Sequence, residues 1–230
     1  MASSPRPTAS LSLWHDAPMR TVPLGEAGVE VSALCLGCMF FGTRVDEETS
    51  MQLLDRYLAA GGSFLDTANN YAFWVEGGGG GESEMLWGRW MRRRGNRDQL
   101  FLATKVGGMP GEDLSRAAIT AAVEGSLRRL GTDRIDLYYA HIDHRTVALE
   151  ETLDAFGERV TAGKVRYIGA ATTPRAALNE RGASATPAGC RGTAAYSSAI
   201  PTYARAQAPA SAPNWSPMTS CWTSAARIPK

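Results

Sequence analysis

The chain of 230 residues is long enough for one domain with a full hydrophobic core. Its net charge of +1, with 20% charged residues, argues against nucleic acid as a partner. No stretch approaches the roughly 18 consecutive apolar residues that span a membrane. Residues 1–18 lack the compact apolar core of a secretion signal, so we expect a disordered leader there. Four cysteines without the spacing of a disulfide framework indicate a reducing, cytoplasmic setting.

The predicted elements alternate between strands and helices from residue 21 to residue 169. Two short runs at residues 21–24 and 29–31 predict a β-hairpin. Apolar runs predict strands at residues 33–37, 63–66, 100–105, 135–140 and 164–169. Helical spacing, with glycine after most segments, predicts helices at residues 46–60, 82–93, 114–130 and 149–162. About five strand–helix units in this order predict an α/β fold with a parallel sheet or barrel.

Polar side chains follow three of the predicted strands at their carboxyl ends. The stretch FLDTANNY, at residues 64–71, leaves its strand at Asp66 and reaches Tyr71 five residues later. Lys105 ends the next strand and His141 follows the one after it. Because right-handed crossovers bring these ends to one side of a parallel sheet, we expect the four side chains to meet there. Taken singly, each has a purely structural explanation; together they indicate proton transfer.

Several motifs in fixed order resemble those of the aldo-keto reductase family over residues 19–170. They are LGCMFFGT, FLDTANNY, GESEMLWGRW, FLATK, LRRLGTDRIDLYYAHID and GKVRYIGA. The resemblance implies a (β/α)8 barrel of the TIM type, here truncated to about five units after the hairpin. It also implies reduction of aldehydes or ketones to alcohols, with a small carbonyl substrate and a nicotinamide cofactor, usually NADPH. The family's catalytic positions fall on Asp66, Tyr71, Lys105 and His141, and cofactor contacts on Gly37, Met39, Asp66 and Tyr71.

These catalytic positions suggest a mechanism. Tyr71 would donate a proton to the carbonyl oxygen as general acid, although a free phenol has a pKa of about 10. Lys105 would lower that pKa and Asp66 would hold the ammonium group in place. His141 would donate a hydrogen bond to the carbonyl. All four residues are expected to act together.

Residues 171–230 differ sharply from the rest. They contain six Lys and Arg residues, one acidic residue, one Leu, two Ile and neither Val nor Phe. Ordering this segment would cost on the order of 60–120 kcal/mol of backbone entropy, which so few large aliphatic side chains cannot offset. We therefore expect disorder over residues 171–230. With five strands the barrel cannot close, so we expect unpaired edges at residues 34–37 and 164–169, weak NADPH binding and impaired activity.

A reading-frame shift near Ala170 would explain this composition. In the frame moved forward by one base, Met218 followed by Thr219 must encode a stop. In the frame moved back by one base, Asn214 with Trp215 must encode Leu, and Met218 with Thr219 must encode Asp. The family usually shows Gly-x-Ser-Asn from the position of Gly169, but the chain reads GAATT there. We interpret residues 171–230 as frame-shifted after the loss of one base; a genuine low-complexity segment is the alternative.

Three other interpretations remain open. A cofactor-sensing regulatory subunit would share the fold, and an intact set of catalytic residues argues for chemistry instead. A metal-dependent hydrolase using His141 and His144 would need further ligands on other strand ends, and His15, the only other histidine, lies in the leader. The CxxC pattern of Cys35 and Cys38 lies in an apolar, strand-like run. We interpret it as two buried thiols and predict no metal site.

Overall fold

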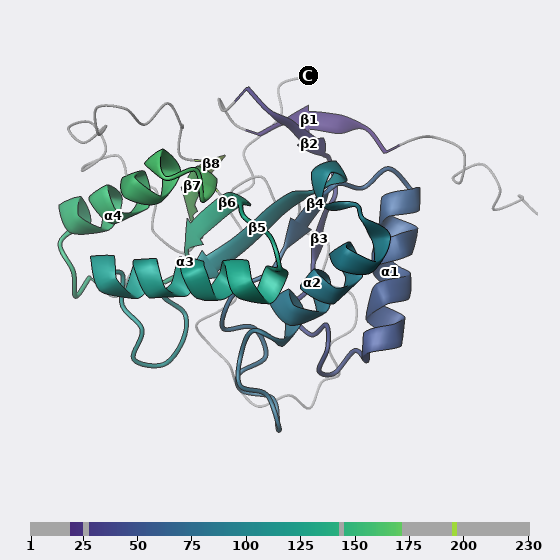
Figure 1. Cartoon of the computed structure of the whole chain (residues 1–230), viewed down its shortest axis with the longest axis horizontal. Helices are drawn as coiled ribbons and strands as arrows, with labels where there is room; N and C mark the ends of the chain where they lie inside the picture. The colour runs from purple at the N-terminus through teal and green to yellow at the C-terminus, as the bar shows by residue number, and fades with distance from the viewer. Residues whose placement is uncertain (1–18, 25–27, 143–144, 172–194, 197–230) are drawn as a thin grey trace, which may run out of the picture.

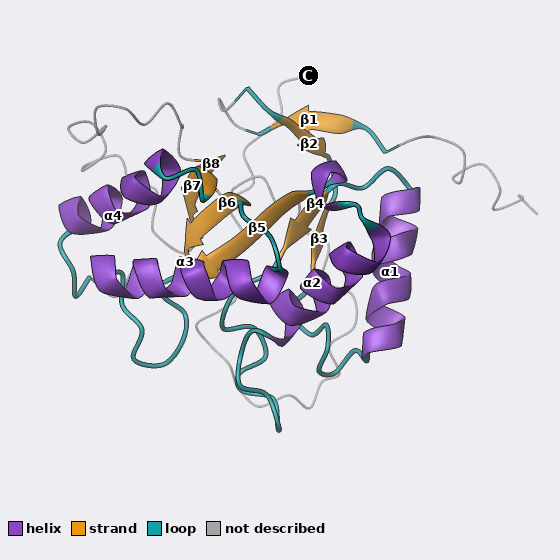
Figure 2. Ribbon diagram, viewed as in Figure 1, coloured by secondary structure: helices purple, strands orange, loops and turns teal. Residues whose placement is uncertain are grey.

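The computed structural model describes residues 19–24, 28–142, 145–171 and 195–196. Within these ranges a parallel sheet of six strands forms the centre, with an antiparallel hairpin at one end (Figure 1). Helices lie along one face of this sheet, as the purple and orange elements of Figure 2 show. The leader predicted at residues 1–18 lies outside the described residues.

The strands follow the predicted order. The hairpin consists of β1 (Thr21–Pro23) and β2 (Glu30–Ser32). The order in the sheet is β3 (Cys35–Gly37), β4 (Phe64–Asp66), β5 (Phe101–Val106), β6 (Ile135–Ala140), β7 (Val165–Ala170) and β8 (Ala195–Tyr196). Each strand runs parallel to its neighbours. The predicted hairpin and parallel α/β sheet are therefore confirmed.

Four of the strands are followed by a helix that begins and ends close to the predicted residues. The helices are α1 (Glu47–Ala59), α2 (Glu82–Arg94), α3 (Arg116–Leu130) and α4 (Leu149–Thr161). Asp46 caps α1 by accepting a hydrogen bond from the Thr49 backbone, and Ser115 caps α3 in the same way from Ala118. A short 3-10 helix, η2 (Arg97–Gln99), was not predicted. No helix in the described ranges is both long enough and apolar enough to cross a lipid bilayer.

The two faces of the sheet bury different side chains, because successive residues of a strand point to opposite sides. Leu102 and Val106 of β5 join the core between the sheet and the helices. Phe101 and Ala103 of the same strand join a second cluster on the other face, where Leu24 and Val31 of the hairpin segment also pack. The same alternation decides to which face of the sheet each side chain at the end of a strand points.

The last strand, β8, overturns one prediction. Gly169 pairs with Ala195, and Ala170 pairs with Tyr196, so this end of β7 is not the unpaired edge expected for residues 164–169. The reason is that two extended residues of the segment predicted to be disordered supply a hydrogen-bonding partner. The remainder of that segment lies outside the described residues, apart from Ala171. Within the described ranges, β3 stands at the opposite end of the sheet order.

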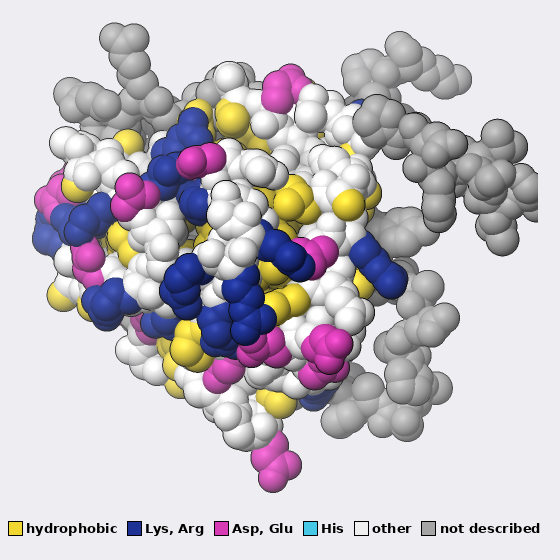
Figure 3. Space-filling view, turned by 45° about the vertical axis from the view of Figure 1, so that its right-hand side comes forward, with side chains coloured by type: hydrophobic (Ala, Val, Ile, Leu, Met, Phe, Trp, Pro, Cys, Tyr) yellow, Lys and Arg dark blue, Asp and Glu magenta, His cyan; other side chains and the backbone are white. Residues whose placement is uncertain are grey.

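Basic side chains gather on the surface shown in Figure 3, and α2 ends with three consecutive arginines. Part of this charge is neutralised by α1. Arg89 lies 2.7 Å from Glu47, and Arg94 lies 2.5 Å from Asp55. Asp55 also accepts a hydrogen bond from the indole of Trp90 at 2.8 Å. These contacts hold α1 against α2 on the outside of the sheet.

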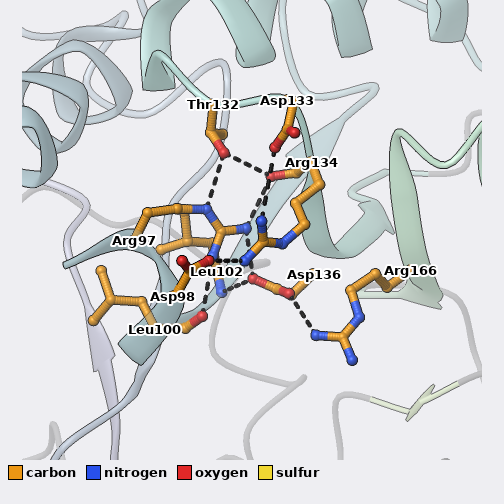
Figure 4. Close-up of polar contacts among 9 residues, drawn as sticks. All are labelled: Arg97, Asp98, Leu100, Leu102, Thr132, Asp133, Arg134, Asp136 and Arg166. Atoms are coloured by element: carbon orange, nitrogen blue, oxygen red, sulfur yellow. Dashed lines mark hydrogen bonds and ion pairs between the residues drawn. The ribbon is translucent and has the colours of Figure 1, made fainter. Parts of the chain in front are cut away.

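A buried carboxylate joins three strands near their amino ends (Figure 4). Asp136, near the start of β6, is 1% exposed. Its Oδ2 accepts hydrogen bonds from Arg97 at 2.8 Å and from the backbone N–H of Leu102, in β5, at 3.0 Å. Its Oδ1 accepts a hydrogen bond from Arg166, in β7, at 3.0 Å. Asp136 thus ties β5, β6 and β7 together at the end of the sheet opposite Lys105 and His141.

Candidate active site

The structure brings the four predicted catalytic side chains to one edge of the sheet. Asp66 ends β4, Lys105 is the penultimate residue of β5, and His141 directly follows β6. These strands are neighbours in the sheet, so their carboxyl ends lie side by side. Tyr71 comes from the loop that leaves β4. The predicted meeting of these residues on one rim is confirmed.

Lys105 is the centre of the site's polar contacts. Its Nζ lies 2.6 Å from Asp66 Oδ2, 2.7 Å from Tyr71 Oη and 2.7 Å from the carbonyl oxygen of Thr67. An ammonium group has three protons to donate, and these three acceptors match them in number. Asp66 and Lys105 are both buried, at 8% and 5% exposure. The ammonium group is therefore held in one position against the phenol.

The pKa of Tyr71 is shifted in the direction opposite to the prediction. Burial raises it well above its usual value, and the carboxylate of Asp66 raises it further. A further contribution comes from the hydrogen bond that Tyr71 Oη donates to Asp66 Oδ2 at 3.1 Å, which favours the neutral phenol. Lys105 was expected to lower this pKa, but in this arrangement burial and Asp66, which contacts both groups, raise it overall. Tyr71 keeps its proton at neutral pH, as a proton donor must.

His141 lies beside the phenol. Its ring centroid is 6.0 Å from that of Tyr71, with the planes at 78°. Burial, and then the charge of Lys105, lower the pKa of His141 to about 4. The imidazole is therefore neutral at pH 7. Its Nδ1 lies 3.1 Å from Oδ1 of Asn70, a contact that the sequence did not predict.

Two asparagines before Tyr71 bind the loop that follows Lys105. Asn70 donates to the carbonyl oxygen of Gly108 at 2.9 Å, and Asn69 donates to Glu112 at 2.8 Å. Glu112 also accepts hydrogen bonds from the backbone N–H groups of residues 107, 108 and 109. Sequence reasoning missed these residues. The available signal was two adjacent amides inside an otherwise buried strand-end motif.

Of the two remaining positions assigned to the cofactor, Gly37 lies next to Asp66 and Met39 follows Gly37 by two residues. Gly37 pairs with Asp66 in the sheet, and a Cβ added at Gly37 would meet no atom within 4 Å. Met39 is 37% exposed, which is unusual for a large apolar side chain in this fold. Open backbone and an exposed apolar side chain suit contact with a flat, largely apolar ring. These residues therefore fit the nicotinamide end of the expected cofactor.

The cysteine pair lies below this rim. Cys38 is fully buried and Cys35 is partly buried, and neither forms a disulfide within the described residues. Burial raises the pKa of both thiols well above the usual value, which favours unreactive thiols. In the described ranges no group of three or more His, Cys, Asp or Glu side chains is arranged to hold a metal ion. His144 lies outside those ranges.

Comparison with known proteins points to one family. The model of the aldo/keto reductase family matches residues 33–182, twelve residues beyond the end expected from the motifs. A norsolorinic acid reductase of Emericella nidulans is 40% identical over 167 residues, covering 64% of this chain and 41% of that protein. An NADP(+)-dependent aryl-alcohol dehydrogenase of Phanerodontia chrysosporium is 34% identical over 193 residues, covering 71% of this chain and 48% of that protein.

Solved structures agree with this result. An aldo-keto reductase from Bacillus halodurans, in its holo form, is 36% identical with a TM-score of 0.61. The match covers 70% of this chain and 53% of that one. The parallel sheet with its outer helices is thus part of a (β/α)8 barrel, as predicted. The chain spans about half the length of the curated relatives it matches.

Proposed function

The chain belongs to the aldo/keto reductase family. We propose that it functions as an enzyme that reduces aldehydes or ketones to alcohols with NADPH. One observation carries the proposal: the buried ammonium group of Lys105 lies 2.7 Å from Tyr71 Oη and 2.6 Å from Asp66 Oδ2. The hydroxyl, cation and carboxylate needed to donate and replace a proton are therefore already assembled. This arrangement supports chemistry over the regulatory alternative.

Each side chain has a defined part in the proposed reaction. Bound NADPH would supply the hydride, with Gly37 and Met39 beside its nicotinamide ring. Tyr71 Oη gives its proton to the carbonyl oxygen as general acid. As the phenol loses that proton, Lys105 stabilises the negative charge that forms on Oη through the hydrogen bond already present. Asp66 keeps the ammonium group in place, and the neutral imidazole of His141 borders the phenol.

The high pKa of Tyr71 is compatible with this role. A donor must be protonated before the reaction, and burial together with Asp66 ensures this. Loss of the proton from Tyr71 becomes favourable only when hydride transfer places negative charge on the carbonyl oxygen, which then takes up the proton. We infer that proton and hydride transfers are closely coupled, because Lys105 alone does not hold a stable phenolate in the resting site.

The test is Tyr71→Phe, which keeps the ring and removes only the proton donor. We expect kcat/KM for an aromatic aldehyde to fall by about 10²–10⁴, followed as oxidation of NADPH. Lys105→Met should produce a loss of similar size. Tyr139→Phe is the matched control, because Tyr139 pairs with Lys105 in the sheet and is also buried.

The assay should use the 230-residue chain and, in parallel, the chain encoded after one base is added near codon 170. The second protein tests whether turnover needs the part of the relatives' length that the 230-residue chain does not match. A Tyr71→Phe protein that retains most of the wild-type kcat would remove Tyr71 from the proposed role. An equal loss in Tyr139→Phe would indicate damage to the fold instead.

A further inference from the structure

The first turn of α2 is tied to the carboxyl end of β5 by a buried carboxylate. Glu84 is 0% exposed, and its Oε1 accepts a hydrogen bond from Oγ1 of Thr104, which is also buried, at 2.6 Å. Its other oxygen, Oε2, accepts from Nε of Arg129, in α3, at 2.7 Å. Burying a charge is costly unless it is paired and hydrogen-bonded. The contact with Arg129 therefore allows Glu84 to lie inside the core and hold Thr104.

The preceding residue of α2 makes a similar contact with the end of β4. Ser83 and Thr67 are both buried, and Thr67 Oγ1 donates a hydrogen bond to Ser83 Oγ at 2.9 Å. The backbone N–H of Thr67 also donates to the carbonyl oxygen of Ala103, in β5, at 2.9 Å. A single turn of α2 thus holds the ends of two neighbouring strands.

Both threonines lie beside the ammonium group of Lys105. Thr104 directly precedes Lys105, and because successive residues of a strand point to opposite faces, the two side chains leave β5 on opposite sides. Thr67 directly follows Asp66, and its carbonyl oxygen accepts a hydrogen bond from Lys105 Nζ at 2.7 Å. The contacts with α2 therefore fix the backbone that carries Lys105 and one of the three acceptors of its ammonium group.

We propose that Ser83 and Glu84 are positioning residues that hold the ammonium group of Lys105 against Oη of Tyr71. They act through the two threonines, whose hydroxyls are buried against α2. The distance that they maintain is the 2.7 Å between Lys105 Nζ and Tyr71 Oη. If either threonine shifts, the ammonium group moves relative to the backbone or to one of its acceptors.

The consequence for catalysis rests on the proposed function, in which Lys105 stabilises the negative charge that forms on Tyr71. A longer distance between Nζ and Oη weakens this stabilisation in the transition state. The threonine hydroxyls face α2, so their loss should not remove a contact with the substrate. Disruption should therefore lower kcat and leave KM nearly unchanged.

Matched variants remove one contact at a time. Thr104→Val deletes the hydroxyl that contacts Glu84 and keeps the shape of the side chain, whereas Thr104→Ser keeps the hydroxyl. Ser83→Ala deletes the contact with Thr67. We expect kcat to fall by about 10–10²-fold in Thr104→Val and Ser83→Ala, the loss that a misplaced catalytic group produces. Thr104→Ser should retain most of the wild-type kcat.

A control variant separates positioning from stability. Thr152, in α4, is buried and donates a hydrogen bond to the carbonyl oxygen of Leu114 at 2.9 Å. Thr152→Val also leaves a buried acceptor without its partner, so its urea midpoint should fall much as in Thr104→Val. Its kcat should nevertheless stay near the wild-type value. An equal loss of kcat in Thr152→Val would overturn the proposal.

NMR observes the ammonium group without turnover. The chain contains three lysines, Lys105, Lys164 and Lys230, so labelling with ¹⁵N-lysine gives few ammonium signals. Lys164→Arg and Lys230→Arg assign the signal of Lys105 by elimination. A buried ammonium group that donates all three protons exchanges them slowly with water. We therefore expect a sharp ¹⁵Nζ–H signal from Lys105 in the wild-type 230-residue chain.

The same signal then tests the two positioning residues. It should broaden or disappear in Thr104→Val and Ser83→Ala, and persist in Thr104→Ser and Thr152→Val. If Thr104→Val does not fold, Ser83→Ala and Thr67→Val decide, because they remove one contact from either side. An unchanged Lys105 signal in the folded variants, or no sharp signal in the wild-type chain, would overturn the proposal.

This readout is independent of NADPH oxidation. A wild-type protein without activity whose Lys105 signal is lost in the variants would contradict the proposed function and support the positioning role. An active protein whose Lys105 signal is the same in every variant would do the reverse. The two conclusions can therefore fail separately.

Discussion

Removing the carboxylate of Asp136 should destabilise the sheet strongly while leaving the catalytic rim in place. Asp136→Ala deletes three acceptor contacts at once: those to Arg97, to the backbone of Leu102 and to Arg166. All three lie near the amino ends of β5, β6 and β7 (Figure 4). In barrels of this type that end serves stability, whereas the carboxyl end carries the chemistry.

The magnitude follows from burial. The Arg97 side chain is 16% exposed, and desolvation lowers the pKa of its guanidinium group, so burying this charge is costly without Asp136. Leaving one partner of such a pair uncompensated costs about 3–5 kcal/mol. Arg166 is 49% exposed, so its contact contributes at most about 1 kcal/mol. We expect Asp136→Ala to lower the free energy of unfolding by about 3–5 kcal/mol.

Urea unfolding, followed by tryptophan fluorescence and circular dichroism, measures this loss. The matched control is Asp98→Ala, because Asp98 pairs with Arg134 while 88% exposed and its loss should change the stability far less. Arg166→Ala should fall in the same low range. Equal losses for Asp136→Ala and Asp98→Ala would refute the assignment of the stability to burial of the pair.

Three further predictions concern other parts of the chain. The pKa of about 4 for His141 lies below the usual 6.5, so the unfolded chain takes up a proton first as the pH falls. Relative to His141→Gln, the wild-type free energy of unfolding should therefore drop by up to about 3 kcal/mol between pH 6.5 and pH 4, and parallel urea curves would contradict this. Gly88→Ala places a Cβ 2.3 Å from the Arg129 carbonyl oxygen, so we expect a loss of at least 1–3 kcal/mol, or failure to fold, in the same assay. Sequencing the gene across codons 167–174 tests the frame shift: one added base should open about 100 or more further codons, and an early stop would show that residues 171–230 are genuine.

The sheet and helices were predictable because each leaves a local signal. Asp46 and Ser115 cap helices where a polar residue precedes helical spacing, and Gly131 ends α3 with a positive φ of 63°. The strand β8 gave no such signal. Two residues beside β7 form a ladder through backbone groups alone, so neither a hydrophobic run nor alternation marks them.

The site was predictable in its members and in the contact of Asp66 with Lys105, but not in its other hydrogen bonds. Spacing placed Asp66, Tyr71 and Lys105 at strand ends, and topology brought the ends together. Whether Asp66 contacts only the cation or also the phenol depends on the folded conformation of the loop between Asp66 and Tyr71. Burial, and then that contact with Asp66, raise the pKa of Tyr71. Asn70 was missed for the same reason, because its partner Gly108 lies 38 residues away.

Two buried aspartates at opposite ends of the sheet show how similar ion pairs acquire different functions. Asp136 accepts from two guanidinium groups and a backbone amide, none of which releases a proton near neutral pH. Asp66 places a single oxygen against both the ammonium of Lys105 and the hydroxyl of Tyr71. In the proposed reaction it is the proton of this hydroxyl that passes to the substrate. The proposed catalytic role of Asp66 therefore rests on its contact with a phenol, which Asp136 lacks.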